Sequence, residues 1–145
     1  MVYGDCATQS KNKVITAEEN KRKFSINNTS GKVVRKVKVD GCLFNNADLT
    51  KRCDYLFEIE EPDSQLICLV IYLELKGCDI EKAYQQLLAT VNQFTTEHRK
   101  IKKECHIVAS RVPKAGPKIQ QLKVKFKKET AATLIVSTDK QFINI

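Results

Sequence analysis

A run of apolar residues in the middle of the chain restricts its fold more than any other feature of the sequence. Residues 66–75 are apolar on both faces of an extended chain until Glu74. A strand of this composition belongs at the centre of a sheet that is covered on both sides. The run is far shorter than the roughly 20 residues that a helix needs to cross a bilayer. We therefore expect a buried β-sheet and no membrane span.

Further strands and helices are predicted on both sides of this segment. The predicted strands are residues 32–44, turning at Asp40-Gly41, and residues 53–59, 105–112, 133–137 and 142–145. The predicted helices are residues 16–25, 79–103 and 118–128. A capping box at Thr16 and Glu19 begins the first, and Asp79 caps the second. Residues 122–126 of the third also alternate as a strand would. This order predicts an α/β sandwich around one mixed sheet, in a single domain of 145 residues whose first 13 are loose.

The chain is strongly basic. It has 25 Lys and Arg against 17 Asp and Glu, a formal net charge of +8. Such a surplus favours a polyanionic partner, with nucleic acid as the first expectation and an anionic membrane surface as the second. The alternative is a basic protein whose charge serves only solubility.

Six cysteines are scattered singly along the sequence, at positions 6, 42, 53, 68, 78 and 105. None belongs to a Cys-x-x-Cys pair, and the two histidines, His98 and His106, complete no zinc pattern with them. We interpret the cysteines as reduced and mostly buried small hydrophobic residues. Because no signal peptide is visible either, the sequence predicts a cytoplasmic protein.

Charged residues at the end of the apolar strand form a candidate site. Glu74 and Lys76 are two residues apart, so they project from the same face. Ending an apolar strand with two charges is costly unless they are solvated, paired or bound to a metal. Asp54, 20 residues before Glu74, opens the preceding strand across a predicted hairpin. The alternative to a functional site is a surface salt bridge at the end of the sheet.

An Asp on one strand and a Glu-x-Lys on the next resembles the PD-(D/E)xK nuclease superfamily, which includes many restriction endonucleases and archaeal-type Holliday junction resolvases. The resemblance covers most of the chain, because the short first helix, the hairpin, the Glu-x-Lys strand and the following helix and strand come in the family's order. It implies a single-domain restriction endonuclease-like fold, with a central mixed sheet flanked by helices. Cys53 stands where the family's signature often has Pro.

The resemblance also implies the roles of individual residues. Asp54, Glu74 and the backbone carbonyl of Leu75 would hold Mg²⁺, for which Mn²⁺ would substitute, and Lys76 would be the catalytic lysine. Glu19, or its neighbour Glu18, would match an acid that many members carry on the first helix. Gln86, or Gln85, would match a glutamine on the helix that follows the Glu-x-Lys strand. The capping box and an exposed helix face are the alternative explanations for these last two pairs.

The implied function is metal-dependent hydrolysis of nucleic-acid phosphodiester bonds, with DNA a more probable substrate than RNA and no membrane partner. Basic side chains would contact the phosphates; the candidates are Arg99, Lys100, Lys102 and Lys103 at the end of the long helix, and Lys123, Lys125 and Lys127 on the last helix. A homodimer would supply the two sites that cutting both strands requires. The alternative is a basic nucleic-acid-binding module or a subunit of a complex on the same fold that does not cut.

Overall fold

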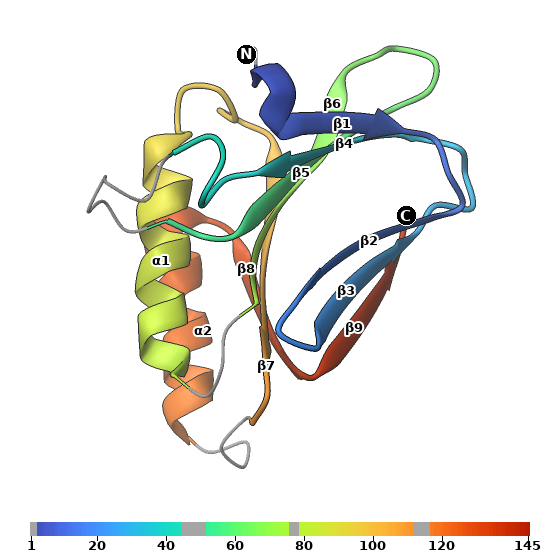
Figure 1. Ribbon diagram of the computed structural model, residues 1–145. Helices are drawn as coiled ribbons and strands as arrows, with labels where there is room; N and C mark the ends of the chain where they lie inside the picture. Colours follow the sequence, from blue (N-terminus) through green and yellow to red (C-terminus); the bar gives the residue numbers. More distant parts are fainter. Residues whose placement is uncertain (1–2, 45–51, 76–78, 112–116) are drawn as a thin grey trace.

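The computed structural model describes residues 3–44, 52–75, 79–111 and 117–145. It consists of a six-stranded mixed sheet, two helices on one face of that sheet and a three-stranded sheet on the other (Figure 1). The large sheet contains, in spatial order, β1 (Ala7–Ser10), β4 (Val33–Lys38), β5 (Tyr55–Glu60), β6 (Ile67–Leu75), β7 (Lys102–Ala109) and β8 (Thr133–Thr138). The small sheet contains β2 (Val14–Glu19), β3 (Arg22–Asn27) and β9 (Lys140–Asn144), with β3 in the middle. The α/β class and the mixed sheet are thereby confirmed.

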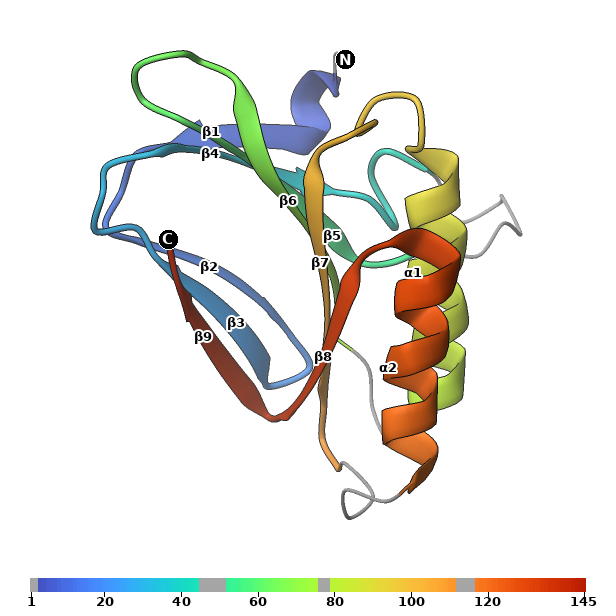
Figure 2. The same ribbon diagram turned by 180° about the vertical axis from the view of Figure 1, so that it is seen from behind.

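The large sheet changes direction at β6. Strands β1, β4, β5 and β6 pair antiparallel, whereas β6, β7 and β8 pair parallel. The parallel strands are connected by α1 (Ile80–Gln93) and α2 (Pro117–Thr130), which lie side by side on the same face (Figures 1 and 2). Each helix runs back antiparallel to the strands, so both helices begin at the end of the sheet where β6 and β7 finish.

Strand β6 is covered on both faces, as its composition predicts. Val70 and Tyr72 pack beneath the helices, in the same core cluster as Leu87 of α1. Ile71 and Leu73 point the other way, into a second cluster that the small sheet covers. Both helices lie on one face of the large sheet, and a second sheet covers the other face, in contrast to the one mixed sheet flanked by helices that was expected.

The helix predicted over residues 16–25 is wrong. This segment belongs to a hairpin of β2 and β3, whose chain reverses at Asn20 and Lys21, both in the left-handed region with φ of 50° and 65°. Ala17 and Phe24 face the large sheet and are buried. Burial of alternate residues against a second sheet therefore outweighs the local preference of a capping box for a helix.

The N-terminal residues, expected to be loose, are held in place. Gly4–Cys6 form a 3-10 helix, and β1 adds an edge strand to β4. A disulfide joins Cys6 to Cys42, so the prediction that all six cysteines are reduced is wrong for this pair. Since disulfides persist in oxidising compartments, the pair removes one of the two reasons for expecting a cytoplasmic protein. No helix of the described part of the chain is long and apolar enough to cross a membrane.

Residues 32–44 form one strand and a turn instead of a strand hairpin. β4 ends at Lys38, and the chain then folds back so that the amides of Leu43 and Phe44 donate to the carbonyls of Lys38 and Val39. The side chains of Val37 and Val39 are buried under the helices. The turn brings Cys42 to its disulfide partner, and the ring of Phe44 lies 4.4 Å from the guanidinium carbon of Arg52.

Helix α1 begins where predicted and ends earlier. The side chain of Asp79 accepts a hydrogen bond from the Lys82 amide, as an N-cap should. The helix stops at Gln93, and turns occupy residues 94–100, so the predicted extension to residue 103 is wrong. The reason is that His98 turns into the core, where it is fully buried, and Lys100 adopts a left-handed φ of 62°.

Strand β7 starts at Lys102, three residues before the predicted Cys105, whereas α2, β8 and β9 lie close to their predicted ranges.

Candidate functional site

The candidate site lies at the end of β6, on the helix-covered side of the large sheet. Strand register pairs Tyr55 with Leu73, which sets Asp54 opposite Glu74. The backbone amide of Asp54 donates to the Leu73 carbonyl over 3.1 Å, and the side-chain Oδ2 of Asp54 accepts from the Leu75 amide over 2.8 Å. Glu74 lies on the same face as Tyr72, two residues earlier, which packs beneath the helices. The structure thus brings together Asp54, Glu74 and Leu75 as predicted neighbours.

The two carboxylates are withdrawn from solvent. Asp54 is 6% exposed and Glu74 is fully buried. Burial raises the pKa of the neighbouring Cys53 thiol far above its ordinary value, and the charges of Glu74 and Asp54 raise it further. The Cys53 thiol is therefore protonated at neutral pH.

Helix α1 holds the segment that carries Asp54. The Cys53 amide donates to Thr90 Oγ1 over 2.7 Å, and Gln86 Nε2 donates to the Arg52 carbonyl over 3.2 Å. From the other side, the Val39 amide donates to the Asp54 carbonyl over 2.9 Å. Helix α1, strand β6 and the residue after β4 therefore fix the position of residues 52–54.

The donor set suits a hard divalent cation. Mg²⁺ is usually bound by one or two carboxylates, with waters and substrate phosphate oxygens completing the shell. Asp54 and Glu74 are two such carboxylates, and the Leu75 carbonyl belongs to the residue whose amide contacts Asp54. No group of three or more His, Cys, Asp and Glu side chains in the described residues is arranged to hold a metal. Lys76, the predicted catalytic lysine, lies outside the described residues.

Glu19 and Gln86, the two further residues implied by the resemblance, lie in different parts of the fold. Glu19 ends β2 and pairs with Lys38 Nζ over 2.8 Å, on the face of the large sheet opposite to the helices, and not on a first helix. Gln86, by contrast, lies on α1, is 9% exposed, and contacts the Arg52 carbonyl beside Asp54. Its Oε1 is buried and has no hydrogen-bond partner among the described residues. Gln85 and Glu18 are exposed.

The predicted basic residues form two groups, one around the start of β7 and the other along α2. Arg99 and Lys100 lie in the turns after α1, and Lys102 and Lys103 begin β7, so the expectation that these four end the long helix is wrong. Lys102 pairs with Leu69, five positions before Glu74 on β6, which corresponds to roughly 16 Å along a strand. This group therefore lies at the far end of the sheet from the site.

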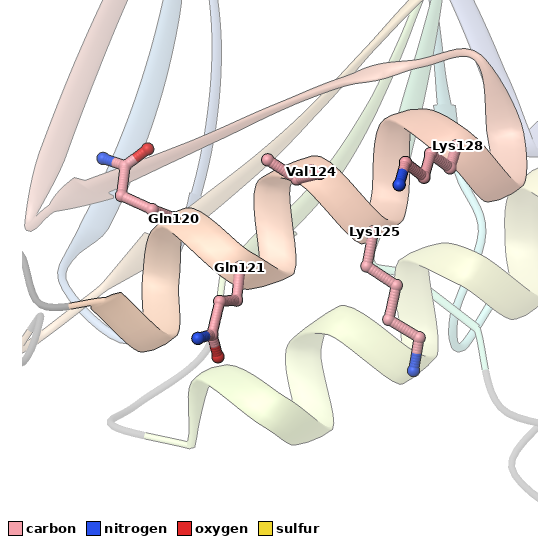
Figure 3. Close-up of a pocket in the computed structure, with 5 residues that line it drawn as sticks. All are labelled: Gln120, Gln121, Val124, Lys125 and Lys128. Atoms are coloured by element: carbon pink, nitrogen blue, oxygen red, sulfur yellow. The ribbon is translucent and has the colours of Figure 1, made fainter.

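Helix α2 carries the second basic group. Its first turn lies beside the first turn of α1, because Lys118 Nζ contacts Glu81 Oε1 over 2.7 Å. Five lysines follow the helix, at 118, 123, 125, 127 and 128, against one acid, Glu129. Figure 3 shows a shallow hollow around the exposed Val124, with Lys125 extending towards α1. Lys125 also lines a groove between α1 and α2 together with Asp79 and Gln85. The basic face thus begins at the end of the sheet where Asp54 and Glu74 lie.

A buried polar network that the sequence did not indicate lies under the same helix-covered face. Glu58 Oε2 accepts from the Tyr3 hydroxyl and contacts His98 Nε2, both over 2.6 Å, and Glu58 Oε1 accepts from Arg35 over 2.8 Å. His98 Nδ1 lies 2.5 Å from the Tyr72 hydroxyl. The two contacts are compatible when Nε2 donates to Glu58 and Nδ1 accepts from the Tyr72 hydroxyl. Each member therefore has a partner.

Sequence reasoning also missed Thr90. Its position, seven residues after Ala83 on the buried face of α1, was available as a signal, since a hydroxyl at a core position of a helix must find a partner.

The chain matches no protein-family model, and comparisons with curated proteins and with solved structures find no match.

Proposed function

We propose that the protein is a metal-dependent nuclease of the PD-(D/E)xK type, acting on DNA more readily than on RNA. The observation that carries the proposal is the hydrogen bond from the Leu75 amide to Asp54 Oδ2, beside Glu74. It joins the Asp54 carboxylate, just before β5, to the residue that follows Glu74 on β6, one position before Lys76 in the sequence. The order of β4, β5, β6, α1 and β7 also agrees with the family's order. The departure is the N-terminal hairpin, which stands where the family has a helix.

In the proposed reaction, water attacks a phosphodiester in line and loses a proton, while the P–O bond opposite the attack breaks and the departing oxygen takes up a proton. No covalent enzyme intermediate forms. Asp54 and Glu74, with the Leu75 carbonyl, would hold a Mg²⁺ ion. Such an ion neutralises charge on the phosphate in the transition state and lowers the pKa of a bound water. Lys76 would act beside the reacting phosphate and would favour the anionic forms of the phosphate and of the attacking water. The hydrogen bond from the Leu75 amide orients the Asp54 carboxylate, and the backbone hydrogen bonds with Leu73 and Val39 hold the main chain of Asp54.

The lysines of α2 are the proposed contacts to the nucleic-acid backbone. Phosphate contacts depend on charge and not on base sequence, and this helix has one acid among its lysines. Because α1 and α2 begin together at the end of the sheet that carries Asp54 and Glu74, a bound strand that follows α2 leads to these two acids. Helix α2 finishes at the far end of the sheet, where Lys127 Nζ donates to Thr133 Oγ1 over 3.4 Å and Thr133 pairs with Glu104 of β7. Arg99, Lys100, Lys102 and Lys103 would therefore serve a substrate that extends along α2 to this end.

The test is cleavage of linear, nicked, branched and single-stranded DNA in Mg²⁺, Mn²⁺ or EDTA. We expect products with either metal, none with EDTA, and none with Glu74→Gln. The matched control is Glu97→Gln, which removes an exposed carboxylate after the end of α1 and should leave the rate unchanged. Cleavage that persists in EDTA, or in Glu74→Gln, would contradict the proposed role of the acids.

One observation favours a second function, a nucleic-acid-binding module that does not cut. Glu74 is fully buried, so a cation can reach it only if residues near the strand end move. In this alternative the acids stabilise the end of the sheet, and the lysines of α2 bind the nucleic acid. The protein would then retard DNA in a gel at low salt, with no cleavage of any substrate in Mg²⁺ or Mn²⁺.

A further inference from the structure

One peptide group of the candidate site is held at both ends by the same helix. The carbonyl of Arg52 and the amide of Cys53 belong to a single planar unit. Gln86 Nε2 donates to that carbonyl over 3.2 Å, and Thr90 Oγ1 accepts from that amide over 2.7 Å. Gln86 and Thr90 are one helical turn apart on α1 and are both buried. The orientation of the peptide plane is thereby fixed by two side chains, and the next residue in the chain is Asp54.

The hydroxyl of Thr90 is oriented for this contact. It donates its own proton to the Gln86 carbonyl over 2.8 Å, within the helix. Its lone pairs are therefore left to accept from the Cys53 amide, which is buried with the rest of that residue. Because a buried amide loses its partner when this oxygen is removed, the segment would have to shift to find another.

We infer that Thr90 and Gln86 are positioning residues for Asp54. They fix the peptide before Asp54, and the hydrogen bond from the Leu75 amide to Asp54 Oδ2 depends on that placement. The inference rests on the proposed function for its consequence in metal binding, but the placement of Asp54 itself can be measured without any metal. Gln86 would thus act by holding the Arg52 carbonyl and not by contacting the substrate directly.

The first measurement is amide hydrogen exchange at Leu75, because this amide is protected only while Asp54 accepts from it. Thr90→Val keeps the shape of the side chain and removes the oxygen, and we expect Leu75 to exchange at least tenfold faster. Thr90→Ser keeps the oxygen and should restore protection. Gln86→Met, which removes the donor to Arg52, is a second variant and should reproduce the effect. Thr95→Val is the matched control, since Thr95 Oγ1 donates only to the Val91 and Asn92 carbonyls.

The second measurement is Mn²⁺ binding to the protein alone, followed by electron paramagnetic resonance. Loss of a partner that orients a metal ligand commonly costs 10–100-fold in metal affinity, and we expect Thr90→Val to weaken Mn²⁺ binding within this range while Thr90→Ser stays near the parent. Unchanged exchange at Leu75 in Thr90→Val and in Gln86→Met would overturn the inference, whatever the activity. A parent protein that binds no Mn²⁺ would instead refute the proposed function, and the exchange at Leu75 would still decide the positioning role.

Discussion

Replacing Glu58 by Gln should lower the free energy of unfolding by about 3 kcal/mol at neutral pH. Burial raises the pKa of the Glu58 carboxyl, but hydrogen bonds from His98, Tyr3 and Arg35 outweigh burial and lower the pKa from 4.5 to about 2. At about 1.36 kcal/mol per pKa unit, this difference corresponds to about 3 kcal/mol of stability from the ionised form. A carboxylate offers two acceptor oxygens to these three donors, whereas an amide offers one, so Gln would turn its NH₂ group towards a donor.

The same linkage gives the pH dependence. Because the pKa is lower in the folded state, the unfolded chain binds the proton first on acidification. The contribution of Glu58 is therefore complete above about pH 4.5 and is lost as the pH falls towards about 2. Urea unfolding followed by circular dichroism, at several pH values between 7 and 2.5, measures it. The difference between the parent and Glu58→Gln should shrink across this range.

A matched control is available at the same end of the strand. Glu61 is half-exposed and pairs with Lys32 over 3.6 Å, and exposed pairs contribute about 1 kcal/mol at most. Glu61→Gln should therefore change stability little at any pH. If Glu58→Gln unfolds at the same urea concentration as the parent at pH 7, or if their difference is as large at pH 3 as at pH 7, the assignment of stability to this carboxylate is wrong.

Four further outcomes are expected. Lys76→Ala should lower the cleavage rate on the order of 10²–10³-fold with DNA binding in gel shift retained, and a variant that cuts at the parent rate would exclude Lys76 from the chemistry. Asp54→Ala should lose activity through lost metal occupancy and recover part of it at high Mn²⁺, which a metal titration of the rate would show. Lys123→Glu combined with Lys127→Glu should weaken DNA binding and flatten the log–log salt dependence by roughly 0.9 for each lost phosphate contact; an unchanged slope would place the DNA elsewhere. Phe24→Ala should cost about 3–5 kcal/mol in urea unfolding, because Phe24 is fully buried between the two sheets.

Where local and tertiary preferences agree, the sequence was enough to predict the structure. The apolar run of residues 66–75 became the central strand, and Asp79 caps α1, because both signals act within a few residues. The pairing of Asp54 with Glu74 followed from one hairpin, since neighbouring strands with a short connection set their own register. These features place the candidate site without any long-range information.

The remaining features depend on contacts that are distant in sequence. The hairpin at residues 14–27 carries a helix-capping signal, and only its burial against the large sheet selects strands. Tyr3 and Glu58 are 55 residues apart, and His98 lies 40 residues beyond Glu58. Cys6 and Cys42 are separated by 36 residues and belong to no spacing motif. No local pattern links such residues, so their pairing could not be predicted from the sequence.

The parallel pairing of β9 with β3 has a consequence for how the chain is made. The two strands meet between residues as far apart as Asn27 and Asn144, separated by 117 positions. Until residues 140–144 have left the ribosome, β3 keeps an unpaired edge, with Phe24 and Ile26 on its inner face. Open edges of this kind recruit strands from other chains, and pairings of high contact order form late. The nascent protein therefore passes through an interval, as long as the synthesis of everything between the two strands, in which the edge of β3 is open to other chains, and slower translation lengthens this interval.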